Sequence, residues 1–380
     1  MSTSVSTKWL ASGTAVAVCA LAIGIGGAAA ETASSDLPSV VRDGRIGYVV
    51  THRYWAVHQT PEGKVECPVG YNDGPREQFK QLFPEDGVKR TLVDTQIMRE
   101  ARQWFPDTSE EPFTFKDAGG KVSFGMDLDG KVKDSDFVSP DGAKGIDNQL
   151  YRAIGCISNY RAPEGTVYHF ENEFMRRYNS NRFMIELSGV DSLVNDDDVT
   201  VKSYRGLDAL ITDATGAAFI PGGTQRIDAR FGREIMSTFK GKIVDGVLTT
   251  DGAPLIVPAS ATFGTSTQHH FKQARFQLKL TPERAEGVIA GYVDVEAFNN
   301  HLNTSWSTHH QSYGQLSAPS LYRALRRLAD GYPDSKTGQM TAISSAMSVK
   351  MVQVYMVHPP QQVASPATGT APVSAQSSQD

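Results

Sequence analysis

Residues 271–280 have the sequence FKQARFQLKL, in which polar and apolar side chains alternate from Arg275 to Leu280. Successive side chains on a β-strand point to opposite faces, so this pattern predicts a strand with one buried and one solvated face. Strands of this kind are typical of antiparallel sheets. The stretch therefore predicts that an antiparallel sheet builds much of this protein.

Short apolar runs of the same kind lie on both sides of it, broken by Gly, Pro, Asp or Asn. They cover residues 183–187, 199–201, 210–211, 241–249 and 287–295. Several short strands at such spacing favour an antiparallel sandwich. We therefore expect an α+β protein, mainly antiparallel β, in which residues 161–360 form a β-sandwich-like region with peripheral helices.

Helical periodicity marks two other segments. In residues 319–330, Leu321, Leu325 and Leu328 share one face, which predicts an amphipathic helix. Residues 31–160 form a mixed α/β region. Within it, residues 45–58 (RIGYVVTHRYWAVH) predict a strand, and residues 92–105 predict a helix from apolar residues at spacings of four and three: Val93, Ile97, Ala101 and Trp104.

The first 30 residues have the features of a cleavable signal peptide. Lys8 supplies the positive charge, residues 15–25 form an apolar run of 11, and Gly26–Ala30 offers small residues before Glu31. A bilayer span takes about 20 residues, so this run is too short for one, although an uncleaved anchor is the alternative. We expect an exported protein, periplasmic or extracellular, with no membrane span after cleavage.

The opposite end predicts disorder. Residues 361–380 (QQVASPATGTAPVSAQSSQD) contain no aromatic residue, no Leu and no Ile, so they cannot bury enough apolar surface to offset the entropy of ordering. Overall, the chain carries 37 basic and 42 acidic residues, a net charge of −5. This mild acidity argues against nucleic acid as a partner and leaves a small molecule, a glycan or a protein.

Cys67 and Cys156 are the two cysteines that remain after signal cleavage. An even number of cysteines in an exported chain favours a disulfide, because that compartment is oxidising. We therefore predict a Cys67–Cys156 bridge, with two buried free thiols as the alternative.

An acidic stretch around residues 127–136 is the best candidate for a metal site. Asp127, Asp129, Asp134 and Asp136 lie within it, and it contains a D-x-D-G sequence of the kind that begins many calcium loops. Asp141 and Asp147 are near enough in sequence to contribute. The stretch lacks the third early ligand and the distal Glu of an EF-hand, and an ordinary solvated acidic loop is the alternative.

The polar and aromatic stretch at residues 303–314 is the candidate for ligand binding. Trp306 and Tyr313 offer stacking faces, and His309 and His310 offer hydrogen bonds, a combination that suits sugars and other polar ligands. The alternative is a loop that packs its tryptophan into the core.

Histidines gather in the same part of the chain, where three from His269, His270, His301, His309 and His310 have the chemistry to ligate a transition metal. Adjacent histidines on a strand point to opposite faces, so each pair offers one ligand at most. The spacing does not force these side chains together, and ordinary surface or core histidines explain it equally well.

No sequence motif names a reaction. The chain has no P-loop, no G-x-S-x-G and no C-x-x-C. We therefore expect a binding or structural component outside the cytoplasm. The alternative is a secreted hydrolase of polysaccharides or esters, since paired catalytic carboxylates leave no local signature.

Overall fold

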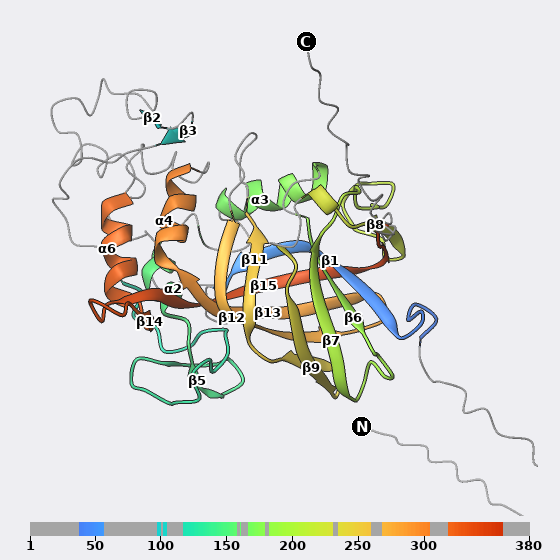
Figure 1. Cartoon of the computed structure of the whole chain (residues 1–380), viewed down its shortest axis with the longest axis horizontal. Helices are drawn as coiled ribbons and strands as arrows, with labels where there is room; N and C mark the ends of the chain where they lie inside the picture. Colours follow the sequence, from blue (N-terminus) through green and yellow to red (C-terminus); the bar gives the residue numbers. More distant parts are fainter. Residues whose placement is uncertain are drawn as a thin grey trace, which may run out of the picture. The chain divides into compact units, whose positions relative to one another are not determined.

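The computed structural model describes residues 38–56, 97–99, 102–104, 117–157, 160, 166–178, 182–230, 235–259, 268–304 and 318–359. Within these ranges the chain is mainly antiparallel β-strand, with four helices (Figure 1). None of these four helices is both long enough and apolar enough to cross a membrane.

Eight antiparallel strands form a closed barrel (Figure 1). The 18-residue strand β15 closes it, because β15 pairs with β13 along one edge and with β1 along the other. Around the barrel the order is β1 (Arg45–Trp55), β6 (Phe183–Ser188), β7 (Asp196–Arg205), β9 (Thr238–Val244), β10 (Val247–Thr250), β12 (Gln268–Leu280), β13 (Arg284–Asp294) and β15 (Met340–Val357).

The β-sandwich-like arrangement expected for residues 161–360 is wrong, because the sheet closes on itself instead of splitting into two packed layers. The FKQARFQLKL stretch does lie in an antiparallel strand, β12, and its burial alternates from Arg275 to Leu280. Alternation shows which side chains are buried, but it fits a sandwich and a barrel equally well. The pairing that closes the barrel joins β15 to β1, two strands that are far apart in the sequence.

Aromatic side chains fill the middle of the barrel. Phe276 of β12 meets Phe239 of β9 edge-on, with ring centres 5.0 Å apart, and stacks on Phe183 of β6 at 6.5 Å. All three residues are buried. An eight-stranded barrel is just wide enough for its own side chains to fill. This part of the interior is therefore a packed core.

The outer wall is covered along part of β1 and β15. Val49 of β1 is buried with Met184, Tyr204, Phe219 and Val352 in a second apolar cluster, whereas its neighbour Tyr48 belongs to the main core. Phe219 lies in the segment that connects β7 to β8 (Gly223–Arg226), and β8 pairs in parallel with β15. Consecutive residues of β1 therefore pack on opposite faces of the barrel wall.

Four helices pack around the barrel: α2 (Gln149–Ile154), α3 (Thr166–Arg177), α4 (Val295–Thr304) and α6 (Ala318–Leu328). Residues 319–330, where we expect an amphipathic helix, hold α6, whose Leu321 and Leu325 are buried. Helix α6 packs against α2 and α4, α4 against the barrel strand β12, and α3 against β1.

The helix expected over residues 92–105 is wrong. Ile97–Arg99 (β2) and Arg102–Trp104 (β3) form a two-stranded antiparallel pair, in which Ile97 lies opposite Trp104. Two residues seven apart share a face of a helix, but they also meet across a short hairpin, so the periodicity fits both. The remaining short strands are β4 (Phe137–Val138), β5 (Lys144–Ile146), β11 (Ala253–Pro258) and β14 (Gly331–Pro333).

Candidate functional site

The acidic loop, defined as residues 127–136, turns back on itself at Gly130. This residue has φ of +73°, a conformation that glycine adopts readily. The N–H of Gly130 donates to Asp127 Oδ1 at 2.7 Å, and the N–H of Lys131 donates to Asp129 Oδ1 at 2.9 Å. The D-L-D-G sequence thus folds into a tight turn that fixes both carboxylates.

Arg275 of β12 holds this turn against the outside of the barrel. Its guanidinium donates to the carbonyl oxygens of Asp127 at 2.8 Å and Leu128 at 3.2 Å. Arg275 precedes the inward-facing Phe276 and points to the opposite face of the strand. The acidic loop is therefore placed by the barrel wall and not by its own sequence alone.

Asp147, which directly follows β5, brings a third carboxylate to the turn. One oxygen from each of Asp127, Asp129 and Asp147 lies within 4.8 Å of the others. Asp147 is fully buried, and its Oδ2 accepts a hydrogen bond from the N–H of Leu128 at 2.7 Å. Its Oδ1 is also buried and has no hydrogen-bond partner in the described part of the chain. An unpaired buried carboxylate oxygen is unfavourable without a partner or a cation.

Burial raises the pKa of Asp147 to about 6, and the negative charges of Asp129 and Asp136 add to that shift. The Lys133 ammonium, which forms an ion pair with Asp129, acts in the opposite direction. The pKa of Lys133 is itself raised, first by its hydrogen bond to Asp129 and also by the charges of Asp147 and Asp136. This part of the structure thus has the electrostatics of a cation site.

The other two acids predicted for this site take different positions. Asp136 accepts a hydrogen bond from the N–H of Lys133 at 2.6 Å, and its charge acts on Asp147. Asp134 and Asp136 both lie outside the group of three whose oxygens converge. Asp141 is held by Ser139 and is also outside this group. Calcium binding itself stays a prediction.

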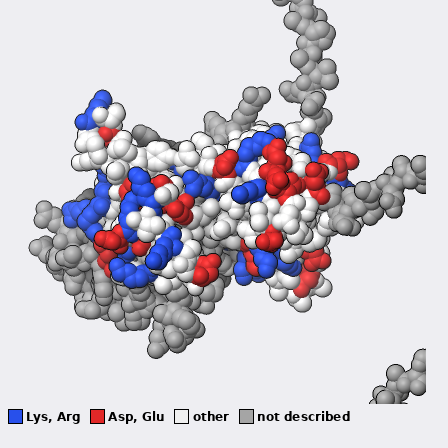
Figure 2. Space-filling view, turned by 90° about the horizontal axis from the view of Figure 1, so that it is seen from below, with Lys and Arg blue, Asp and Glu red and all other residues white. Residues whose placement is uncertain are grey.

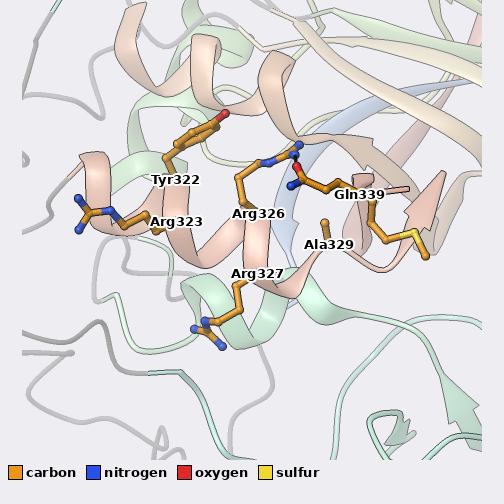
Figure 3. A pocket seen from close by; sticks show the side chains of 7 residues that line it. Tyr322, Arg323, Arg326, Arg327, Ala329 and Gln339 are labelled. Atoms are coloured by element: carbon orange, nitrogen blue, oxygen red, sulfur yellow. Dashed lines mark hydrogen bonds between the residues drawn. The ribbon is translucent and has the colours of Figure 1, made fainter. Parts of the chain in front are cut away.

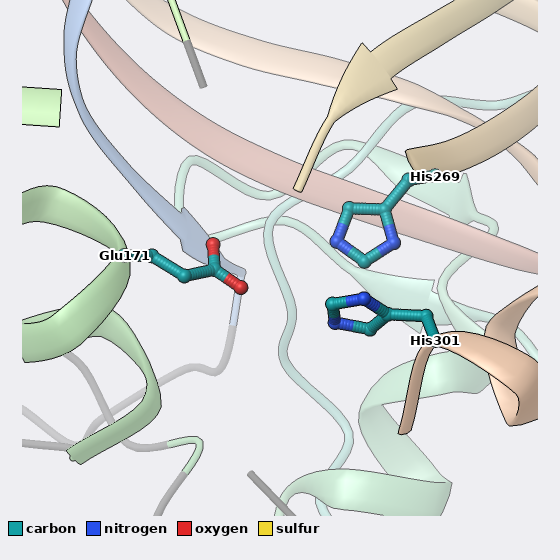
Figure 4. Close-up of side chains that lie close together, drawn as sticks. All are labelled: Glu171, His269 and His301. Atoms are coloured by element: carbon teal, nitrogen blue, oxygen red, sulfur yellow. The ribbon is translucent and has the colours of Figure 1, made fainter. Parts of the chain in front are cut away.

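A second group of potential ligands lies where β12 begins, beneath α3 and α4. It consists of Glu171 of α3, His269 of β12 and His301 of α4, and we refer to it as the Glu–His–His cluster. Figure 4 shows the carboxylate of Glu171 directed toward the two imidazole rings. One ligand atom from each residue lies within 4.8 Å of the others, and all three residues are buried. His270, the next residue after His269, is exposed.

Aromatic rings enclose the two histidines. The ring of His269 meets that of His301 edge-on, with centres 4.6 Å apart, and that of Trp55 at 4.9 Å. Burial and the nearby charge of Arg53 lower the pKa of His301 to about 3. Burial first, then His301 and Arg53, holds the pKa of His269 well below its usual value. Both imidazoles are therefore neutral at pH 7, and each has one nitrogen with a lone pair.

Arg53 of β1 fixes the carboxylate of this cluster. Its Nε donates to Glu171 Oε2 at 2.9 Å, and its Nη1 donates to the carbonyl of Pro258. Burial raises the pKa of Glu171, and the charge of Arg53 opposes that shift. Among the described residues, two buried polar atoms here have no hydrogen-bond partner, Nη2 of Arg53 and Nδ1 of His269.

A surface pocket beside α6, with a volume of about 500 Å³, is lined by the arginines Arg323, Arg326 and Arg327 (Figure 3). Arg326 and Arg327 line it, but both are paired. Arg327 forms two hydrogen bonds with Asp117, and Arg326 binds Gln339 at 2.8 Å and lies 3.8 Å from Glu296. Basic and acidic side chains also alternate over the face drawn in Figure 2. Paired charges of this kind favour a structural role for these arginines.

Several predicted residues lie outside the described ranges. These are the candidate ligand-binding residues Trp306, His309, His310 and Tyr313, together with Cys67, the predicted signal peptide and the C-terminal tail. Cys156 is described and is fully buried just after α2. The Cys67–Cys156 bridge stays a prediction.

Comparison of the chain with protein-family models, with curated proteins and with solved structures gives no match in any of the three. Function is therefore inferred from geometry and chemistry.

Glu171 is not among the site residues that we expect from the sequence, although one sequence pattern points to it. This residue precedes Met175 by four positions, so both lie on the same face of α3, and both are buried. A carboxylate on the buried face of an amphipathic helix needs a partner, which Arg53 supplies.

Proposed function

We propose that this chain is an exported calcium-binding barrel protein, in which one Ca²⁺ ion fixes the acidic loop against the barrel wall. The observation that carries the proposal is the carboxylate of Asp147. It is fully buried, one of its oxygens has no partner, and it lies beside the carboxylates of Asp127 and Asp129. The predicted signal peptide supports export.

The oxygen donors suit calcium better than other common metals. Ca²⁺ takes six to eight oxygen ligands at about 2.3–2.6 Å, and carboxylates, backbone carbonyls and water all serve. Gly145, at φ of +78°, leaves room next to these oxygens. A Cβ at this position would lie 3.0 Å from the carbonyl oxygen of Lys131 and 3.7 Å from Asp127 Oδ2. A side chain here would therefore press on the backbone of the acidic loop at Lys131 and come into ordinary contact with Asp127 Oδ2.

Electrostatics supply the driving force. At pH 7 the buried Asp147 is ionised, since its pKa is about 6, and two further carboxylates face it. In the absence of calcium, the ammonium of Lys133 partly compensates these charges through Asp129. Calcium would supply two charges where lysine supplies one. Extracellular modules bind calcium at about 10⁻⁴ to 10⁻³ M, which external calcium suffices to fill.

A binding or structural role outside the cytoplasm fits this site better than hydrolysis. A glycosidase needs two carboxylates roughly 5 to 10 Å apart across a groove. Among the described residues, no acid lines the pocket beside α6, and Glu286 is the one acid that lines a second pocket of about 370 Å³ next to Tyr54. Neither pocket supports the hydrolase alternative.

Thermal unfolding with and without calcium tests the proposal. For the wild type, we expect millimolar calcium to raise Tm and chelator to reverse the rise, because calcium at a tenfold excess over Kd stabilises the native state by about 1.4 kcal/mol. Asp147→Asn should abolish this response.

Asp134→Asn is the matched control. It removes the same charge from the same loop, but Asp134 is outside the group of three converging carboxylates. We expect this variant to keep the calcium response. A wild-type Tm that ignores both calcium and chelator would contradict the proposal, and so would equal loss of the response in the two variants.

A further inference from the structure

We propose that the Glu–His–His cluster is a second metal site, specific for a transition metal of the zinc type, with Glu171, His269 and His301 as its three protein ligands. The proposal is independent of calcium binding, because it uses other residues in another part of the fold. The coordination position that these three residues leave open on the metal would take an anionic ligand.

The donor set selects the metal. Two imidazoles and one carboxylate form a ligand set that zinc uses at sites with one open coordination position. Calcium prefers an all-oxygen shell, so the two sites of this protein should not compete for the same ion. Both imidazoles are uncharged at pH 7 and therefore present a lone pair without first releasing a proton.

The geometry places the donors close to one another before any metal arrives. The three ligand atoms lie within 4.8 Å of each other, whereas donors around one tetrahedral zinc ion lie roughly 3.3 Å apart at Zn–N distances of about 2.1 Å. Coordination would draw the three ligand atoms closer together. Nδ1 of His269 is buried without a partner, which is unfavourable in the metal-free protein and is relieved by coordination.

Arg53 would act on the metal through Glu171. Its Nε holds Glu171 Oε2, which orients the carboxylate in the way that outer hydrogen bonds orient metal ligands. The charges of Arg53 and Glu171 cancel, so a divalent ion leaves the buried site with net positive charge. An anion on the metal would reduce that charge, and Nη2 of Arg53, which has no partner, is available to donate to it.

Titration of chelator-treated full-length protein with Co²⁺, a coloured substitute for Zn²⁺, tests the site. We expect one equivalent to bind at micromolar concentration with visible absorption bands, and Zn²⁺ to displace it. His269→Gln and His301→Gln should each weaken binding by more than about 100-fold, because they remove ligands and not outer-shell partners. His270→Gln is the matched control, since His270 is adjacent in sequence but exposed, and it should bind as the wild type does.

Two further measurements keep the result interpretable. Circular dichroism of each variant establishes that it is folded, and Asp147→Asn, which leaves the Glu–His–His cluster intact, should bind Co²⁺ fully. Failure of the wild type to bind Co²⁺ or Zn²⁺ would overturn the proposal. Loss of binding in His270→Gln equal to that in His269→Gln would also overturn it. Neither outcome bears on the calcium response.

Discussion

The acidic loop together with Asp147 and the Glu–His–His cluster each bring three potential ligands within 4.8 Å of one another, yet the two sites are built in opposite ways. Asp127, Asp129 and Asp147 come from one short stretch, and the turn at Gly130 places the first two. Glu171 and His269 come from elements far apart in sequence, and only the closed barrel brings them together. The acidic site therefore depends mainly on a short sequence motif, whereas the Glu–His–His cluster depends on the fold.

The two sites share an electrostatic feature. In both, burial is the main cause of the pKa shift, and in both it favours the uncharged form of the buried group. For Asp147 this raises the pKa, and for His301 it lowers the pKa. A bound cation would favour the ionised form of Asp147 and the neutral form of His301. The metal would therefore reverse the effect of burial at the first site and agree with it at the second.

The largest difference between the sites should appear when their arginines are removed. Arg53→Met leaves Glu171 buried without its ion-pair partner, which typically lowers the free energy of unfolding by about 3–5 kcal/mol. Arg275→Met removes only hydrogen bonds to two carbonyls on the outside of the barrel, for which we expect a loss of about 1–2 kcal/mol. Urea denaturation of both variants in chelator measures the difference. Equal losses would show that the Glu–His–His cluster is not a buried charged site.

The same contrast explains how much could be predicted from the sequence. The D-L-D-G stretch predicts two of the three converging acids, Asp127 and Asp129, because a turn is a local structure. His269 and His301 stand out by composition, but their meeting with Glu171 depends on strand pairing over long distances. Barrel closure could not be predicted for the same reason. The periodicity of a strand shows which of its two faces is buried, but it does not show which strand pairs with each of its edges.

The pH dependence of stability should run in opposite directions at the two sites. Asp147 has a folded pKa of about 6, above its unfolded value of about 3.9, so protons favour the native state between these values. Its burial therefore opposes folding by roughly 3 kcal/mol at pH 7, a cost that disappears as the pH falls through 6 toward 4. His301 has a folded pKa of about 3, below its unfolded value of about 6.5, so protons favour the unfolded state. The burial of His301 therefore leaves the free energy of unfolding unchanged above pH 6.5 and lowers it by roughly 2 kcal/mol at pH 5.

Denaturation of metal-free protein at pH 7 and pH 5 tests this prediction. Compared with the wild type, Asp147→Asn should gain most stability at pH 7. The stability of His301→Gln should fall less than that of the wild type between pH 7 and pH 5. Parallel pH profiles for the wild type and both variants would mean that neither buried group titrates as the structure indicates.

The smallest expected effect concerns Lys133, whose ammonium occupies the position where calcium would compensate charge. Lys133→Gln removes an ion pair with Asp129 that is partly exposed to solvent, so the calcium-free protein should lose less than about 1 kcal/mol. The same change removes a competing cation close to three acids, Asp129, Asp136 and Asp147. We expect calcium to bind more tightly by about fivefold, or about 1 kcal/mol, which is the Coulomb energy of two unit charges about 4 Å apart when water screens them fully.

Lys131→Gln is the control for Lys133, because it removes one positive charge from the same loop. The charge of Lys131 acts on Asp129 less than that of Lys133 does, so calcium affinity should change less in this variant than in Lys133→Gln. Calorimetric titration of both variants at low and high salt separates the local effect from the net charge, since screening weakens long-range attraction more than close contact. If Lys133→Gln instead bound calcium more weakly, the Lys133 ammonium would stabilise the conformation of the acidic loop and would not take the place of the calcium ion. The acidic loop would then depend on internal ion pairs for its order, as the Glu–His–His cluster depends on Arg53.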